Sequence, residues 1–152
     1  MRVRVLDPEL TPLRAHDTDA GLDLRASKRF VLEPGQRMLI GTGVEIVGKP
    51  GTVVILKPRS SLAVMGIDVM AGVIDAGYEG EVKALLINHS DELVVGGRGD
   101  RICQAIQLDL TDEPDVFEYP SRDDERTFVE KWANRKSKTV RGKGGFGSTG
   151  AR

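Results

Sequence analysis

The sequence predicts a mostly β protein with a jelly-roll-like β-barrel, and two observations support this prediction. Short runs rich in β-branched residues recur along the chain, with glycine and proline between them. Long helical periodicity is absent before residue 120. Short strands separated by turn residues are typical of a sandwich, a barrel or a jelly roll.

The strand-length runs begin where Leu22 and Leu24 alternate with polar residues. Longer apolar runs follow at residues 37–40, 44–47, 52–56, 82–87 and 101–108. Segment 72–82 is typical of a tight hairpin, and we expect Gly77 to supply its turn.

The pattern changes after residue 120. Ser121 and Asp124 match a helix-capping pattern, and Phe128, Val129 and Trp132 share one helical face. We predict one short helix at 122–135, inside an insertion at about 111–138. Its apolar face would pack on the barrel itself or on a partner protein. The expected organisation is a barrel domain at 1–140 and a mobile glycine-rich arm at 141–152.

Composition narrows the class of protein. The 152 residues carry 22 Lys and Arg against 23 Asp and Glu, a net charge of −1. One domain is expected at this length, and the balanced charge gives no support for nucleic-acid binding. No apolar run is long enough to span a membrane, so no membrane partner is expected. The single cysteine, Cys103, fits a reducing compartment, and we expect a cytoplasmic protein, in the host cell's cytoplasm if a phage or virus encodes it.

Several segments carry polar side chains suited to chemistry. Arg59, Ser60 and Ser61 follow an apolar strand and could bind an anion, or could form a solvated turn. Asp23 could orient a metal-bound water, tie down a neighbouring arginine, or face solvent. Gln104 could hydrogen-bond to a ligand, or it could simply face outward from its strand. Asp75 could take a proton from water, or merely bond its own turn.

The segment Arg141–Gly150 is glycine-rich and cationic, with one aromatic residue and two hydroxyls. Its backbone N–H groups, Arg141, Ser148 and Thr149 could hold phosphate oxygens, and Phe146 could lie on a flat ring. The alternative is a plain flexible tail.

Five segments, in this order, resemble the motifs of the all-β dUTP pyrophosphatases (dUTPases): AGLDL, PRSSLA, GVIDAGYEGEV, GDRICQ and RGKGGFGSTG. The resemblance implies hydrolysis of dUTP to dUMP and pyrophosphate by water attack at the α-phosphorus. It implies a homotrimer whose active sites are shared between subunits. It also implies Mg²⁺ bound mainly by the substrate triphosphate.

The resemblance assigns roles to particular residues. Asp75 matches the carboxylate that activates water, and Asp23 matches an acid that acts on the metal only through water. Arg59, Ser60 and Gln104 match contacts around the reacting phosphate. The implied substrate contacts are Ser61, Gly72, Val73, Ile74, Tyr78, Arg141, Phe146, Gly147, Ser148 and Thr149.

The chain also departs from the family pattern. Glu79 and Glu81 follow Tyr78, and we expect both to face solvent, away from a triphosphate. The span that holds the 111–138 insertion is longer than expected. Two alternatives to a dUTP hydrolase stay open: a dCTP deaminase-like relative, and a nucleotide-gated binding protein that uses the insertion as a partner surface.

Overall fold

The computed structural model describes residues 1–110. The elements, in chain order, are β1 (Arg2–Val5), the 3-10 helix η1 (Pro8–Leu10), β2 (Leu22–Arg25), β3 (Phe30–Leu32), β4 (Arg37–Val47), β5 (Thr52–Lys57), α1 (Ser60–Val64), β6 (Ile67–Met70), β7 (Val73–Asp75), β8 (Glu81–Asn88), β9 (Val94–Gly96) and β10 (Arg101–Asp109). The expected helix at 122–135, the insertion at 111–138 and the arm at 141–152 lie outside the described residues.

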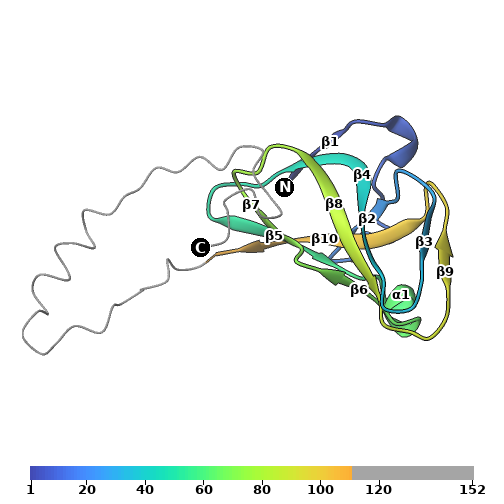
Figure 1. Ribbon diagram of the computed structural model, residues 1–152. Coiled ribbons are helices and arrows are strands. Elements are labelled where there is room, and N and C mark those ends of the chain that lie inside the picture. The colour runs from blue at the N-terminus through green and yellow to red at the C-terminus, as the bar shows by residue number, and fades with distance from the viewer. Residues whose placement is uncertain (111–152) are drawn as a thin grey trace, which may run out of the picture.

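The strands form two four-stranded sheets and one two-stranded sheet. The strand orders are β1-β4-β8-β6, β2-β10-β5-β7 and β3-β9, and every pairing between neighbours is antiparallel. In Figure 1 the elements α1, β3 and β9 lie at one end of the barrel, and β7 lies at the other. The predicted mostly β, jelly-roll-like fold is confirmed.

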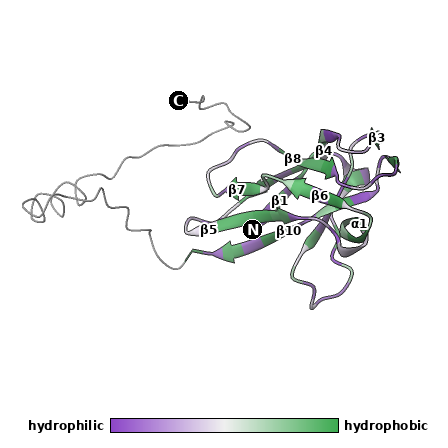
Figure 2. Cartoon of the chain, turned by 60° about the horizontal axis from the view of Figure 1, so that its bottom comes forward, coloured by the Kyte–Doolittle hydropathy of each residue, from purple (hydrophilic) through white to green (hydrophobic). Residues whose placement is uncertain are grey.

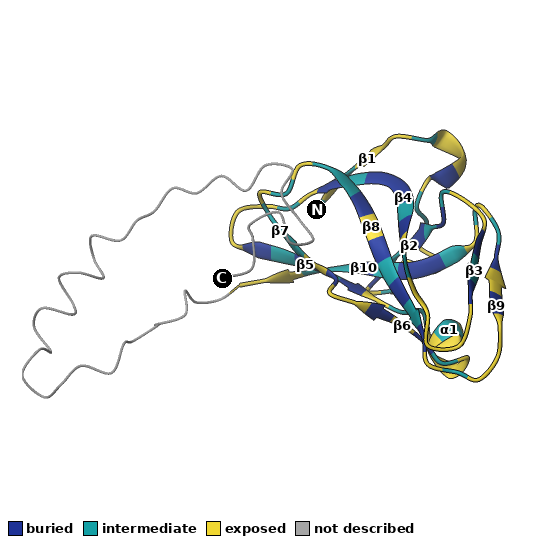
Figure 3. Ribbon diagram, in the orientation of Figure 1, coloured by how far each residue is buried: buried dark blue, intermediate teal, exposed yellow. Residues whose placement is uncertain are grey.

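The core lies between the two larger sheets because their strands alternate in burial. In β8, Val82, Ala84 and Leu86 are buried, while Lys83 between them is exposed. Apolar and polar side chains therefore separate to opposite faces of a strand. Figure 2 shows apolar colouring along the strands, and Figure 3 shows burial alternating along the same elements.

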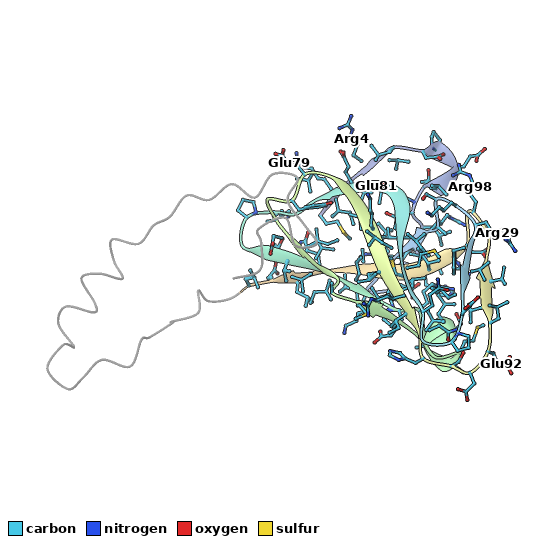
Figure 4. All side chains as sticks on the ribbon, viewed as in Figure 1. Arg4, Arg29, Glu79, Glu81, Glu92 and Arg98 are labelled. Carbon is cyan, nitrogen blue, oxygen red and sulfur yellow. The ribbon has the colours of Figure 1, made fainter. Side chains whose placement is uncertain are left out.

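The strand predictions at 22–24, 52–56, 82–87 and 101–108 are confirmed. The runs at 37–40 and 44–47 join into the single strand β4, whose register shifts between Gly41 and Glu45. Glu81 stabilises this irregular stretch, because its Oε1 accepts a hydrogen bond from the Gly43 N–H at 2.9 Å. Glu81 is therefore half-buried against β4, and the expectation that it faces solvent is wrong. Glu79 is exposed as expected, and Figure 4 labels both side chains.

The expected hairpin at 72–82 is wrong in its pairing. A turn is present, since the Tyr78 N–H donates to the Asp75 carbonyl at 3.0 Å. Its two flanking strands separate, however: β7 pairs with β5, whereas β8 pairs with β4 and β6. The chain therefore crosses from one sheet to the other at this turn.

A left-handed backbone occurs just before β7. Ala71 has φ 57° and Gly72 has φ 79°. The Leu56 N–H donates to the Gly72 carbonyl at 2.7 Å, which holds this turn against β5. A Cβ on Gly72 would lie 2.9 Å from the Leu56 carbonyl oxygen, so position 72 requires glycine for both conformation and space.

The short helix α1 was not expected. It follows β5, and its first backbone bond runs from the Ala63 N–H to the Arg59 carbonyl at 2.9 Å. Arg59 stands at the N-cap without a side-chain capping bond. The sequence therefore lacked the usual hydroxyl or carboxylate signal for a helix start at this place.

Arg98 ties the N-terminal segment to the turn between β9 and β10. Its Nη2 donates to Asp7 Oδ2 at 2.6 Å and to Glu9 Oε2 at 2.9 Å, and its Nη1 donates to the Ser27 carbonyl at 2.9 Å. The hydrogen bond from Arg98 is the main cause that lowers the pKa of Asp7. Figure 4 labels Arg98 at the surface.

Candidate functional site

A pocket of about 240 Å³ lies where β2, β10 and the start of α1 meet. Three of the motifs quoted above contribute to it, although they are far apart in the chain. Its lining residues are Ala15, Asp19, Ala20, Gly21, Asp23, Arg59, Ser60 and Gln104.

Strand register explains why these side chains converge. Gln104 on β10 is the Cα partner of Asp23 on β2 and, on its other side, of Lys57 on β5. Arg59 follows the end of β5 by two residues. The neighbouring strands therefore bring the Asp23 carboxylate, the Gln104 amide and the Arg59 guanidinium together at one end of the sheet.

Asp23 accepts hydrogen bonds from two arginines. Arg59 Nε donates to Oδ1 at 3.1 Å, and Arg101 Nη1 donates to Oδ2 at 3.1 Å. Of the alternatives for Asp23, the structure shows the one in which the carboxylate ties down neighbouring arginines. Arg59 and Arg101 together offset the two carboxylates beside the pocket, Asp19 and Asp23. The donor groups of Arg59, Ser60 and Gln104 are what suit an anionic ligand there.

Gln104 is held in place from two sides. Its Nε2 donates to the Pro58 carbonyl at 3.1 Å. On the other side lies Gly21, where an added Cβ would stand 2.4 Å from Gln104 Oε1 and 3.0 Å from Gln104 Cβ. Only glycine leaves room for the Gln104 side chain in this position, so Gly21 helps to fix the polar wall of the pocket.

The other residues expected in the site lie elsewhere on this chain. Asp75 is half-buried on β7, opposite Val53 of β5. A strand advances about 3.3 Å per residue, so β5 spans roughly 13 Å from Val53 to Lys57, the partner of Gln104, and Arg59 follows beyond that strand end. Within one chain Asp75 therefore lies far from Arg59 and Gln104.

The segment around Asp75 has its own ordered features. Among the described strands, β7 has β5 as its one neighbour, so it stands at a sheet edge. Val73 on this edge is 61% exposed. The Tyr78 hydroxyl donates to the Glu81 carbonyl at 3.1 Å, which fixes the direction of the ring. Of the expected contacts, Ser61 is exposed on α1, and Ile74 is half-buried on β7.

Sequence reasoning missed Gly21 and Arg101, and also Ala15, Asp19 and Ala20 of the pocket lining. Gly21 and Arg101 both stand inside the quoted motifs AGLDL and GDRICQ, but their partners are far away in the chain. The Arg101–Asp23 bond joins residues 78 positions apart, so no local pattern announces it. The expected contacts Arg141, Phe146, Gly147, Ser148 and Thr149 lie outside the described residues.

The described residues show no set of three or more His, Cys, Asp or Glu side chains that could hold a metal ion. Asp23 is the carboxylate expected to act through metal-bound water, and both its oxygens already accept from arginines.

Cys103 takes no part in the pocket. Its side chain is buried next to Gln104 in sequence but on the core side of β10. Burial, with a smaller effect of the Asp23 charge, raises the pKa of this thiol to about 12. A neutral thiol in the core packs as a small apolar side chain. No helix among the described residues has the length and apolar character needed to cross a membrane.

Antiparallel sheets that present arginine, hydroxyl and amide donors at one pocket define a class: all-β proteins with a site for an anionic ligand. Within this class the family can be stated. The dUTPase family model matches residues 9–150, and the chain belongs to the dUTPase family.

Relatives and solved structures agree with this assignment. Deoxyuridine 5'-triphosphate nucleotidohydrolase of Nocardia farcinica is 41% identical over 155 residues, covering 97% of this chain and 84% of the relative. The Corynebacterium glutamicum protein of the same name is 42% identical over 152 residues, covering 95% and 91%. The dUTPase structure from Streptococcus mutans matches with a TM-score of 0.65 at 30% identity, covering 73% of this chain and 94% of that one.

A phage protein shows the same fold at lower identity. The dUTPase from phage phi11 of S. aureus matches with a TM-score of 0.68 at 23% identity, covering 80% of this chain and 97% of that chain.

Proposed function

We propose that this chain hydrolyses dUTP to dUMP and pyrophosphate, which keeps uracil out of DNA and supplies dUMP for thymidylate synthesis. Family membership supports this function, because the relatives that match almost the whole chain are named deoxyuridine 5'-triphosphate nucleotidohydrolases. One structural observation carries it: Asp23, Arg59, Ser60 and Gln104, from three separate motifs, line one pocket.

The pocket holds the phosphates. The guanidinium of Arg59 and the Gln104 amide donate to phosphate oxygens, and Ser60 stands near the bond that breaks. Ser61 adds a hydroxyl beside it on α1. Donors fixed before the substrate arrives stabilise the negative charge of the transition state without having to reorganise.

The nucleoside binds at the segment from Gly72 to Tyr78. The backbone of β7 at Val73 and Ile74 forms hydrogen bonds with the polar atoms of uracil. The β7 backbone lies so close to the base that a 5-methyl group would clash with it. The ring of Tyr78, fixed by the Glu81 carbonyl at 3.1 Å, packs on the deoxyribose and excludes a 2′-hydroxyl. A steric clash and an unpaired polar group both discriminate strongly between substrates.

The site is shared between copies of the chain. Arg59 and Asp75 must both stand within a few ångströms of the α-phosphorus, yet in one chain they belong to opposite ends of β5, whose span from Val53 to Lys57 is roughly 13 Å. A second copy can supply β7 next to the phosphate pocket of the first. A homotrimer with three shared sites, as the resemblance implies, satisfies this requirement.

Asp75 acts as the general base. Its carboxylate takes a proton from a water molecule, and the water oxygen forms a bond to the α-phosphorus. The bond from that phosphorus to the oxygen bridging the β-phosphate breaks, and the electron pair leaves with pyrophosphate. Asp75 then gives the proton to solvent, and the products are dUMP and pyrophosphate.

Mg²⁺ would be held mainly by the substrate triphosphate, as the resemblance implies. When bound there, the ion offsets phosphate charge. Asp23 holds Arg59 and Arg101 beside the pocket through its two hydrogen bonds.

The segments outside the described residues complete the proposal on sequence grounds. In the 141–152 arm, Arg141, Gly147, Ser148 and Thr149 contact phosphates, and Phe146 covers the uracil ring. We propose a barrel domain over 1–140, in which the insertion expected at 111–138 braces the assembly or contacts a partner protein. The helix at 122–135 stays a prediction from the sequence.

Pyrophosphate release tests the proposed function. The full chain is assayed with dUTP, dTTP, dCTP and UTP in the presence of Mg²⁺, with ammonia release from dCTP followed in parallel. We expect release from dUTP far above the other three, and no ammonia. Equal rates with dUTP and dTTP would contradict the proposed exclusion of the 5-methyl group. Ammonia release from dCTP would identify a deaminase instead.

A further inference from the structure

Asp23 has an unusual pair of partners for a single carboxylate. Arg59 Nε reaches its Oδ1 and Arg101 Nη1 reaches its Oδ2, both at 3.1 Å. The side chain of Asp23 is 14% exposed, against 25% for Arg59 and 36% for Arg101. A carboxylate with so little access to water depends on these two donors for its hydrogen bonds.

The contact with Asp23 sets the direction of Arg59. A guanidinium is planar and carries its five N–H donors in a rigid fork. Because Nε of Arg59 donates to Asp23, the plane of the group is fixed. Its Nη1 and Nη2 end is then the part that can bind an anion in the pocket, which Arg59 and Ser60 line.

We infer that Arg101 is a positioning residue for phosphate binding: it holds the carboxylate of Asp23, and Asp23 aims Arg59 at the substrate. This inference rests on the proposed function, which assigns Arg59 to the phosphates. Without Arg101, rotation of the Asp23 carboxylate would let both its oxygens share Arg59. The donor fork would then turn toward Asp23 and away from the phosphates.

Arg25 provides a matched control on the same two strands. It is the Cα partner of Arg101 in the β2–β10 pair, and it carries the same charge. Its Nη1 donates to the Gly99 carbonyl at 2.8 Å instead of to Asp23. Removing Arg25 therefore changes the local charge as much as removing Arg101 does, while the Asp23–Arg59 contact keeps its second anchor.

The first experiment compares Arg101→Met, Arg101→Lys and Arg25→Met with the wild-type chain. Calorimetry measures the Kd of a non-hydrolysable α,β-imido analogue of dUTP, with Mg²⁺ and in EDTA, and steady-state assays give kcat and KM. We expect Arg101→Met to weaken analogue binding about tenfold, mainly as a rise in KM. Arg101→Lys should recover most of this loss, and Arg25→Met should change the Kd less than about twofold.

The outcomes separate the inference from the function on which it rests. Equal Kd values for Arg101→Met and Arg25→Met, in a chain that hydrolyses dUTP, would overturn the inference alone. A wild-type chain that neither binds the analogue nor hydrolyses dUTP would overturn the proposed function, and the inference with it. A loss seen only with Mg²⁺ would place the effect at the metal, and would also overturn the inference.

A double-mutant cycle tests the route through Asp23. In an Asp23→Asn background, Arg101→Met should weaken analogue binding by less than about twofold. The carboxylate through which Arg101 acts on Arg59 is already absent from that variant. A full tenfold loss in that background would show that Arg101 acts directly on the substrate. Should Arg101→Met fail to fold, Arg101→Gln provides the same comparison.

Discussion

Replacing Gly21 by alanine should misplace Gln104 while the barrel still folds. The new Cβ would stand 2.4 Å from Gln104 Oε1, 3.0 Å from its Cβ and 3.1 Å from its Cδ. Rotating the amide relieves the first contact, but the Cβ of Gln104 is fixed by the pairing of β10 with β2. The side chain must therefore take another rotamer and give up the 3.1 Å bond to the Pro58 carbonyl.

The size of the effect follows from this displacement. Restoring an ordinary separation from 2.4 Å moves the amide by about 1 Å, and a shift of that size in a positioning group costs on the order of tenfold to hundredfold in rate. Overpacking of the site costs about 1–3 kcal/mol of stability, a part of which the flexible end of Gln104 relieves. We expect kcat/KM to fall much more than the melting temperature.

The assay measures kcat/KM for dUTP together with thermal unfolding. The control is Gly97→Ala, because a Cβ there meets its nearest atom, Asp100 Oδ2, at an ordinary 3.6 Å. That variant should keep both wild-type values. If Gly21→Ala keeps the wild-type kcat/KM, the absence of a Cβ at position 21 is not what holds the Gln104 side chain in place.

Three further predictions concern other side chains. Asp75→Asn should bind the imido analogue with near wild-type Kd but lose about 10²–10⁴-fold in kcat, and unchanged turnover would remove Asp75 as the base. Cys103, with its pKa raised to about 12, is almost wholly protonated at pH 8, so it should resist iodoacetamide until the chain unfolds; rapid labelling of the native protein would contradict its burial. Its raised pKa stabilises the fold below the ordinary thiol value, and this contribution should be lost as pH rises from about 9 toward 12. Because Arg98 lowers the pKa of Asp7, their bond stabilises the fold above the ordinary value of 3.8 and is lost as pH falls through the lowered value. Arg98→Met should therefore be less stable than wild type at pH 6 in urea unfolding, and equal losses at pH 6 and pH 2 would count against this bond.

Much of the fold could be predicted from local patterns. The alternation in Glu81–Asn88 and the β-branched run in Thr52–Lys57 fixed both the strand type and the buried face. The pairing of the segment around Gly77 could not be predicted in this way. Its turn is real, but a turn signal does not say whether the flanking strands pair with each other or with distant strands such as β5.

The candidate site shows the same limit. Arg59, Ser60 and Gln104 could be chosen because their side chains suit phosphates and because the motifs occur in family order. The roles of Gly21 and Arg101 depend on partners in other strands, so only the sheet register reveals them. The distance between Asp75 and Arg59 is also a property of the folded chain, and it is the reason that the site needs a second copy.

Mixing two inactive variants tests the shared site most directly. Arg59→Ala and Asp75→Asn are each inactive alone, and they are unfolded together in equal amounts and refolded. If each site takes Arg59 from one copy and Asp75 from another, random assembly restores both groups in about a quarter of the sites, and activity returns to about a quarter of the wild-type value. If both groups act from the same chain, no site is complete, and a mixture as inactive as its components would contradict the account.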